Sequence, residues 1–243
     1  MFDGLLLDID RIEYQAGLDL MRALAAAKAA AYEAGEAAPE VLILAEHDPV
    51  ITLGRRAGTE EVTASPELLA RAGVKLFHIE RGGLATYHGP GQIVAYPVFH
   101  LRTVKLGVVS LVRKLEEAVI AVLGEYGLAG GRREGHPGVF VGPLKVASIG
   151  LAVRRSVSFH GLALNYDPDL SHFGLINPCG LSSRTITSLA GLLGRPVDPA
   201  VLRNKMAAHL ARVFNLKLRP GTLDQAAALI GKQAHAAPQT AVA

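Results

Sequence analysis

The stretch RGGLATYHGPGQ, residues 81–92, is the part of the chain around which the other segments are arranged. It contains four glycines and one proline, so its backbone must turn sharply or pass close to another group. It also carries several hydrogen-bonding side chains, those of Arg81, Thr86, Tyr87, His88 and Gln92. Largely apolar runs flank it, over 74–79 and 93–99, and such runs are typical of strands. The pattern predicts a functional loop between two strands, with a plain double turn as the alternative.

These glycines do not form a nucleotide-binding motif. No Gly-Lys-Ser/Thr sequence ends the stretch, and no Gly-x-Gly-x-x-Gly run opens a helix. A phosphate-binding loop is therefore not expected here.

Composition limits the class of protein. Half of the 243 residues are hydrophobic, enough for one large domain that buries roughly 70–75% of its surface. The net charge is only +3 and tryptophan is absent, so no nucleic-acid partner is expected. No apolar run is long enough to cross a membrane, and no signal peptide is recognisable at the N-terminus. A single cysteine excludes an internal disulfide framework, which fits a reducing compartment such as the cytoplasm.

Hydrophobic periodicity and capping residues predict the elements. Helices are expected at 13–34, 66–72, 107–126 and 199–214, with a short final helix after Thr222. Ser65, Asp198 and the pair Thr222 and Gln225 have the residue types of N-terminal caps. Strands are expected at 4–9, 41–45 and 50–54, then a loop at 127–138 and a hairpin at 139–153. The result is one mixed α/β domain over 1–230, followed by a frayed tail over 231–243.

The only cysteine, Cys179, lies in the sequence INPCG, residues 176–180. A lone cysteine is commonly a small buried apolar residue. Its place between Pro178 and Gly180 indicates a turn, and that setting favours a reactive thiol.

Taken together, these stretches resemble the octanoyltransferases of lipoate biosynthesis, the lipoyl(octanoyl) transferase family. Three blocks carry the resemblance in the family's order: residues 81–97, GPLKVASIG at 142–150, and FHGLALN at 159–165 followed by NPCG at 177–180. The family usually has tryptophan where Phe140 stands, so an indole N–H is missing here. The resemblance implies the fold of the biotin and lipoate protein ligases, an α+β arrangement with helices packed on the faces of a mixed β-sheet.

The resemblance also implies that Cys179 and Lys145 are catalytic. Cys179 would take an octanoyl or lipoyl group from acyl carrier protein as a thioester, and a lysine of an acceptor domain would then form the amide. Lys145 would favour the thiolate as an ammonium and take a proton in its neutral form. Its position alone favours an exposed strand lysine instead, and only the family resemblance points to a catalytic role. The implied acceptors are lipoyl domains of 2-oxoacid dehydrogenase complexes and the glycine cleavage H protein, and no cofactor or metal is expected.

Three walls of a substrate site follow from the same resemblance. They are the loop formed by Arg81, Gly82, Gly83, Leu84, Ala85, Thr86, Tyr87 and His88, then Ser148, Ile149 and Gly150, then Gly161, Leu162 and Ala163. Small residues are expected to leave room for an eight-carbon chain. His88 is either a hydrogen-bonding group in the acyl pocket or a structural histidine, and His160 has the same ambiguity. His47 has no partner at metal spacing, so an orienting hydrogen bond is expected for it.

Other functions stay open from the sequence. An ATP-dependent lipoate or biotin protein ligase shares the Arg-Gly-Gly loop and a downstream lysine but does not need the cysteine. A non-enzymatic acyl-chain binding protein would bury Cys179 in an inert form, and a Cys–His hydrolase would need a histidine beside it. The NPCG sequence at 177–180 separates the transferase from the ligase.

Overall fold

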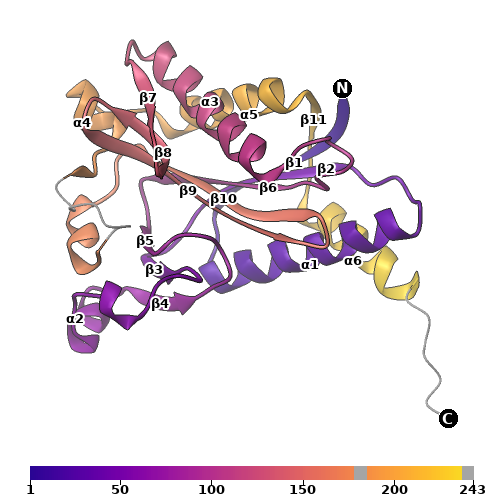
Figure 1. Ribbon diagram of the computed structural model, residues 1–243, viewed down its shortest axis with the longest axis horizontal. Helices are drawn as coiled ribbons and strands as arrows, with labels where there is room; N and C mark the ends of the chain where they lie inside the picture. Colours follow the sequence, from indigo (N-terminus) through magenta and orange to yellow (C-terminus); the bar gives the residue numbers. More distant parts are fainter. Residues whose placement is uncertain (178–184, 237–243) are drawn as a thin grey trace.

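Figure 1 shows the computed structural model, which describes residues 1–177 and 185–236. Within these residues the largest element is an eight-stranded sheet of order β11–β1–β2–β6–β10–β9–β8–β7. Its strands are β1 (Phe2–Arg11), β2 (Glu40–Glu46), β6 (Gln92–Val98), β7 (Gly130–Arg133), β8 (His136–Val141), β9 (Leu144–Arg154), β10 (Val157–Asn165) and β11 (Leu216–Pro220). β1 pairs in parallel with β2 and β11, and the other pairs are antiparallel. The mixed sheet predicted from the sequence is confirmed.

Helices cover both faces of this sheet. α3 (Val108–Glu125) and α5 (Pro199–Phe214) lie on one face, and α1 (Tyr14–Glu33) and α6 (Leu223–Ala236) lie on the other (Figure 1). The alternation of side chains along β2 explains the two cores: Leu42 and Leu44 join the core of α3 and α5, whereas Ile43 joins that of α1. All seven residues of β2 are buried, as in strands covered on both faces.

A smaller sheet carries part of the 81–92 stretch. Among the described residues its order is β4 (Lys75–His78), β3 (Val50–Leu53), β5 (Ala85–His88). With α2 (Pro66–Arg71) and the 3₁₀ segment η2 (Leu170–Leu175), it encloses a third core that contains Ile51, Tyr87 and Ile186. Two further short elements are η1 (Thr59–Glu61) and α4 (Leu189–Leu193).

The predicted helix caps are confirmed. Ser65 Oγ accepts a hydrogen bond from the backbone N–H of Leu68 at 3.3 Å, at the start of α2. Asp198 accepts from the N–H groups of Ala200 and Val201 at the start of α5. Thr222 and Gln225 exchange two hydrogen bonds of 3.2 Å, which form the expected capping box before α6.

Several predictions of elements were wrong. Residues 85–88 form β5 instead of loop, because this segment pairs antiparallel with β3 despite the glycines around it. Residues 127–138 contain β7 and the start of β8, and β10 and β11 lie where no strand was predicted. The helix α6 continues to Ala236, into the segment expected to be frayed from residue 231, and 237–243 lie outside the described residues. The division into one domain and a tail stays a prediction.

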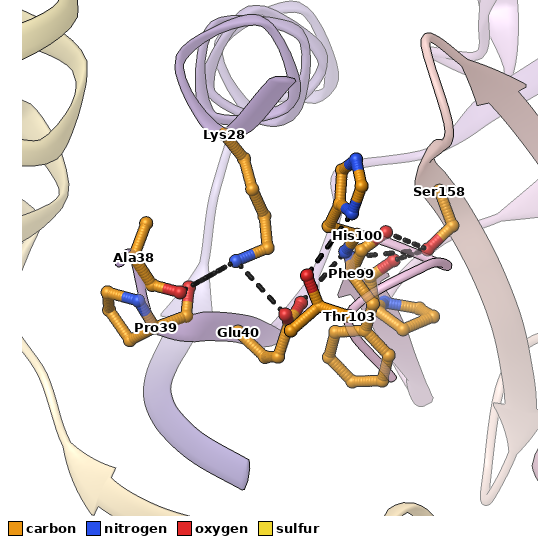
Figure 2. Close-up of polar contacts among 9 residues, drawn as sticks. Lys28, Ala38, Pro39, Glu40, Phe99, His100, Thr103 and Ser158 are labelled. Atoms are coloured by element: carbon orange, nitrogen blue, oxygen red, sulfur yellow. Dashed lines mark hydrogen bonds and ion pairs between the residues drawn. The ribbon is translucent and has the colours of Figure 1, made fainter. Parts of the chain in front are cut away.

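A buried ion pair joins α1 to β2 (Figure 2). Lys28 Nζ lies 3.2 Å from Glu40 Oε1 and also donates to the carbonyls of Ala38 and Pro39. Glu40 Oε2 accepts from the backbone N–H of His100 at 2.9 Å, just after β6. The Lys28 and Glu40 side chains are 6% and 1% exposed. Burial raises the pKa of Glu40 to about 7, although Lys28 acts in the opposite direction.

Among the described residues, no helix has both the length and the apolar character needed to cross a membrane.

Candidate active site

A cavity of about 540 Å³ lies where the small sheet meets β9 and β10. Backbone pairing brings the predicted walls together around it. Gly161, Leu162 and Ala163 of β10 lie opposite Gly150, Ile149 and Ser148 of β9, residue for residue. The N–H of Gly82 donates to Leu151 O at 2.9 Å and so attaches the loop to β9. Sequence blocks far apart in the chain therefore form one concave surface, the form in which ligand sites usually occur.

Most of the predicted substrate residues line this cavity. They are Arg81, Gly82, Gly83, Leu84, Ala85, Thr86, His88, Ser148, Ile149, Gly150, Gly161, Leu162 and Ala163, together with Lys145. Tyr87 does not line it. Successive side chains of a strand point to opposite faces, and in β5 the Tyr87 ring packs into the third core against Phe173. Tyr87 thus contributes to the core beneath β5 and does not contact the cavity.

Two of the wall glycines do not provide the space expected of them. A Cβ added at Gly161 would overlap Ala95 O, so glycine is needed there because β10 and β6 approach closely. At Gly150 an added Cβ would lie 3.0 Å from both Arg81 Cδ and Gly82 O. These glycines allow backbone segments to approach, whereas at Gly82 the nearest atom would be Leu151 O at 3.6 Å. The expectation that all the small wall residues leave room for a chain was wrong for Gly161 and Gly150.

Arg81 holds the loop from inside. Its side chain is 5% exposed. It donates to Thr52 through Nη2, to the carbonyl at 2.6 Å and to Oγ1 at 2.8 Å. Nη1 donates to Gly82 O at 3.1 Å. Because a planar guanidinium fixes several acceptors at once, Arg81 anchors the turn at Gly82 to β3 and places a positive charge at the cavity wall.

His88 forms a neutral part of the cavity wall that is held by hydrogen bonds. His88 Nδ1 lies 3.1 Å from Gln92 Oε1, and Gln92 in turn donates to Tyr87 O. Burial lowers the pKa of His88 to about 3, with the charges of His47 and Arg81 acting in the same direction. His88 is therefore uncharged at neutral pH and is held by hydrogen bonds while it lines the cavity. His47 bonds Ile12 O and the Tyr96 hydroxyl, so the orienting hydrogen bond predicted for it is confirmed.

His160 occupies an unusual backbone position. Its φ is +56°, in the left-handed region that non-glycine residues rarely adopt. Its side chain is buried, lines the cavity and has Nε2 3.8 Å from Glu80 Oε2. Burial lowers the pKa of His160, which Glu80 partly offsets. Glu80 does not line the cavity and is itself held by two hydrogen bonds from Arg22.

Lys145 reaches the cavity because of an irregularity in the hairpin. Val139 pairs with Ala147 but Phe140 pairs with Lys145, so β9 contains one extra residue, Val146. Such a β-bulge changes the direction in which nearby side chains point. Lys145 is 5% exposed and lines the cavity, so it is not the exposed strand lysine that the sequence allowed. Its Nζ lies 5.6 Å from the centre of the Phe140 ring, where a cation is attracted to the ring face.

Cys179 lies outside the described residues, but both ends of its segment are placed. Before it, the N–H of Asn177 donates to Glu61 O at 2.8 Å. After it, the N–H of Thr187 donates to Lys145 O at 2.9 Å, and Ile186 pairs with Lys145 as an isolated bridge. Ile186 also lines the cavity. The chain therefore returns from the segment directly beside Lys145.

Several other residues that line the cavity were not predicted from the sequence. They are Tyr14, Arg56, Val94, Tyr96, Val108, Val112, 135–137, Leu151, Phe173 and Ile186. Tyr14 and Val112 lie on helix faces whose periodicity is that of ordinary core residues, and Tyr96 lies in an apolar strand. No local pattern distinguishes such residues from packing residues.

Known proteins resemble this chain over most of its length. The profile of the lipoyl protein ligase A/B catalytic domain matches residues 14–211. The octanoyltransferase of Syntrophobacter fumaroxidans is 42% identical over 93% of this chain and 96% of its own length. That of Chloroflexus aurantiacus is 45% identical over 87% of this chain and 94% of its own. The chain belongs to the octanoyltransferase family.

Membership makes it an acyltransferase. The fold extends to more distant proteins. A bipartite lipoate protein ligase from Thermoplasma acidophilum superposes with a TM-score of 0.69 over 96% of this chain and 91% of its own, at 20% identity. The predicted ligase-like fold is therefore confirmed.

Proposed function

We propose that this octanoyltransferase moves an octanoyl group from acyl carrier protein to a lysine of a lipoate-accepting domain, through a thioester on Cys179. The observation that carries the proposal is the position of Lys145 at the cavity, with the chain that follows Cys179 paired to its backbone. The family assignment of the chain supports the acyl group and the reaction class.

In the first step, the Cys179 thiolate attacks the octanoyl carbonyl of the carrier thioester. A new C–S bond forms, the C–S bond to the carrier breaks, and the carrier thiolate leaves and takes up the proton that the Lys145 ammonium gives up, which leaves Lys145 neutral for the second step. Lys145 as an ammonium would raise the fraction of Cys179 present as thiolate, the form that reacts. One thioester replaces another, so this step needs no nucleotide.

In the second step, an acceptor lysine attacks the Cys179 thioester. The C–N bond of the amide forms, the C–S bond breaks, and the Cys179 sulfur leaves as a thiolate. The attacking amine must lose a proton, and Lys145 in its neutral form would accept it. The lipoyl domains of 2-oxoacid dehydrogenase complexes and the glycine cleavage H protein are the acceptors we propose.

The cavity suits an uncharged acyl chain. Val94, Leu151 and Leu162 provide apolar surface, and the buried His88 is neutral at physiological pH. A free Cys179 also requires a reducing environment, so we place the reaction in the cytoplasm.

The experiment is a transfer assay from octanoyl-acyl carrier protein to an apo lipoyl domain, without ATP or magnesium. We expect complete octanoylation of the acceptor lysine, seen by intact mass. A requirement for ATP, or transfer only from free octanoate, would instead establish the ligase reaction. The shared fold does not decide between the two, because the T. acidophilum ligase has it as well.

A further inference from the structure

Glu116 is a buried carboxylate on the inner face of α3. The helix face around it is apolar, with Leu115, Val119 and Val122 fully buried. Glu116 is 2% exposed and does not line the cavity. A buried carboxylate lowers the stability of the folded protein unless hydrogen bonds and ion pairs compensate its charge. The groups that bond Glu116 therefore indicate its role.

Those partners lie on the two strands of the β7–β8 hairpin and on α3 itself. Glu116 Oε2 accepts from Arg132 Nε on β7 at 2.8 Å and from Arg113 Nη1 at 3.1 Å. Glu116 Oε1 accepts from the backbone N–H of Gly138 on β8 at 3.3 Å. Arg132 also donates to Arg113 O, which closes the network. One side chain therefore fixes both strands of the hairpin to the helix.

Gly138 has a backbone conformation that other residues avoid. Its φ is +139°, in a region populated almost only by glycine. A Cβ at this position would overlap Ala147 O and would lie 2.7 Å from Lys145 Cε. The Gly138 backbone therefore lies directly against the side chain of Lys145.

The hydrogen bond from the Gly138 N–H to Glu116 Oε1 holds the Gly138 peptide in place. Gly138 begins the stretch of β8 that faces the bulge at Val146, and Phe140 of the same stretch carries the ring near Lys145 Nζ. The Gly138 backbone and the Phe140 ring, two residues apart on β8, therefore both lie close to the Lys145 side chain. We propose that Glu116 is a positioning residue: by holding the Gly138 peptide in place, it fixes the position of the Lys145 amine.

This inference rests on the proposed role of Lys145 in transfer, but its test does not. The reactivity of the Lys145 amine toward acetic anhydride, measured against pH by peptide mass spectrometry, reports the surroundings of the amine whether or not the enzyme transfers octanoate. Lys75 on β4 and Lys217 on β11, both exposed and on elements that do not contact Glu116, are internal references in the same digest.

The variants are Glu116→Leu, which removes the acceptor, and Glu116→Gln, which keeps the shape and one acceptor. Glu117→Gln is the matched control, because Glu117 is the exposed neighbour on the same helix. Val119→Ala controls for a general loss of packing in α3. Circular dichroism establishes which variants fold, and Glu116→Gln provides the test if Glu116→Leu does not.

We expect the Glu116 variants to change the rate and pH profile of Lys145 labelling, with the reference lysines unchanged. Transfer should fall by roughly 10- to 100-fold in kcat, because a small misplacement of a catalytic group has effects of that size. In the Lys145→Ala background, a further Glu116→Gln change should have no added effect on transfer. Both controls should behave as wild type in the labelling assay.

Two results separate the possible failures. Altered Lys145 labelling in a protein whose wild type transfers no octanoyl group would keep the positioning role and remove the proposed function. Unaltered Lys145 labelling in a folded Glu116 variant would overturn the positioning role, whatever the transfer assay shows.

Discussion

The Lys145 side chain is buried and lies close to the backbone and to an aromatic ring of β8. Gly138 lies against its Cε, and the Phe140 ring centre is 5.6 Å from its Nζ. A buried side chain has little conformational entropy left to lose when substrate binds. Low exposure would also strengthen its electrostatic effect on the proposed Cys179 thiolate, because little water screens the charge. Both properties suit a residue that acts first as a cation and then as a base.

Substitution of Lys145 separates these two roles. Lys145→Ala should slow alkylation of Cys179 by iodoacetamide at about pH 6 by roughly tenfold or more, because an adjacent ammonium favours the thiolate. Lys145→Arg should keep fast alkylation and then stall after acylation, because a guanidinium keeps the charge but cannot accept a proton. Alkylation rates and the amount of octanoyl-enzyme are both measured by mass spectrometry. Equal alkylation rates in wild type and Lys145→Ala would show that the two residues are not paired.

Between elements, the ion pair of Lys28 and Glu40 fixes α1 to β2 and makes this contact sensitive to pH (Figure 2). Burial raises the pKa of Glu40 to about 7 in the folded protein, from an ordinary value of 4.5. The folded state therefore binds more protons than the unfolded state between these two values. The contribution of Glu40 to stability consequently falls as the pH rises through that window.

Lys28→Met removes the cation that holds the pKa of Glu40 down. The variant should be less stable than wild type by roughly 3–5 kcal/mol at about pH 8, where an uncompensated carboxylate is buried. The loss should be smaller at about pH 5, where Glu40 takes up a proton. Urea unfolding at both pH values measures the difference, and Glu40→Gln in the Lys28→Met background should recover stability at the higher pH. An equal loss of stability at both pH values would contradict the raised pKa of Glu40.

At the scale of the whole molecule, the cavity exists because the 81–92 stretch crosses from the small sheet to the large one. Glu46, at the end of β2, holds this crossing: it accepts from the N–H of Gly91 at 3.0 Å and from the Tyr166 hydroxyl at 2.8 Å. The walls are then completed by β9 and β10, whose residues pair across the ladder. Three segments distant in sequence meet at one surface.

The sequence predicts those features that depend only on residues close together in the chain. Ser65 and Asp198 cap helices where expected, because a cap depends on residues three positions apart. The family resemblance predicts Tyr87 among the substrate-binding residues, but its ring packs into the third core because successive side chains of a strand point to opposite faces. Tyr14 and Val112 could not be identified, since only tertiary packing brings α1 and α3 to the cavity. The bulge at Val146 has no sequence signature, yet it brings Lys145 to the cavity.

The central claim is that the octanoyl group passes through Cys179. The most direct measurement incubates the enzyme with octanoyl-acyl carrier protein, without acceptor, ATP or magnesium, and maps the adduct by peptide mass spectrometry. The account predicts one octanoyl group per chain on Cys179, released when an apo lipoyl domain is added, and no adduct with Cys179→Ala. An unmodified Cys179 in an enzyme that still transfers, or full transfer by Cys179→Ala, would contradict it.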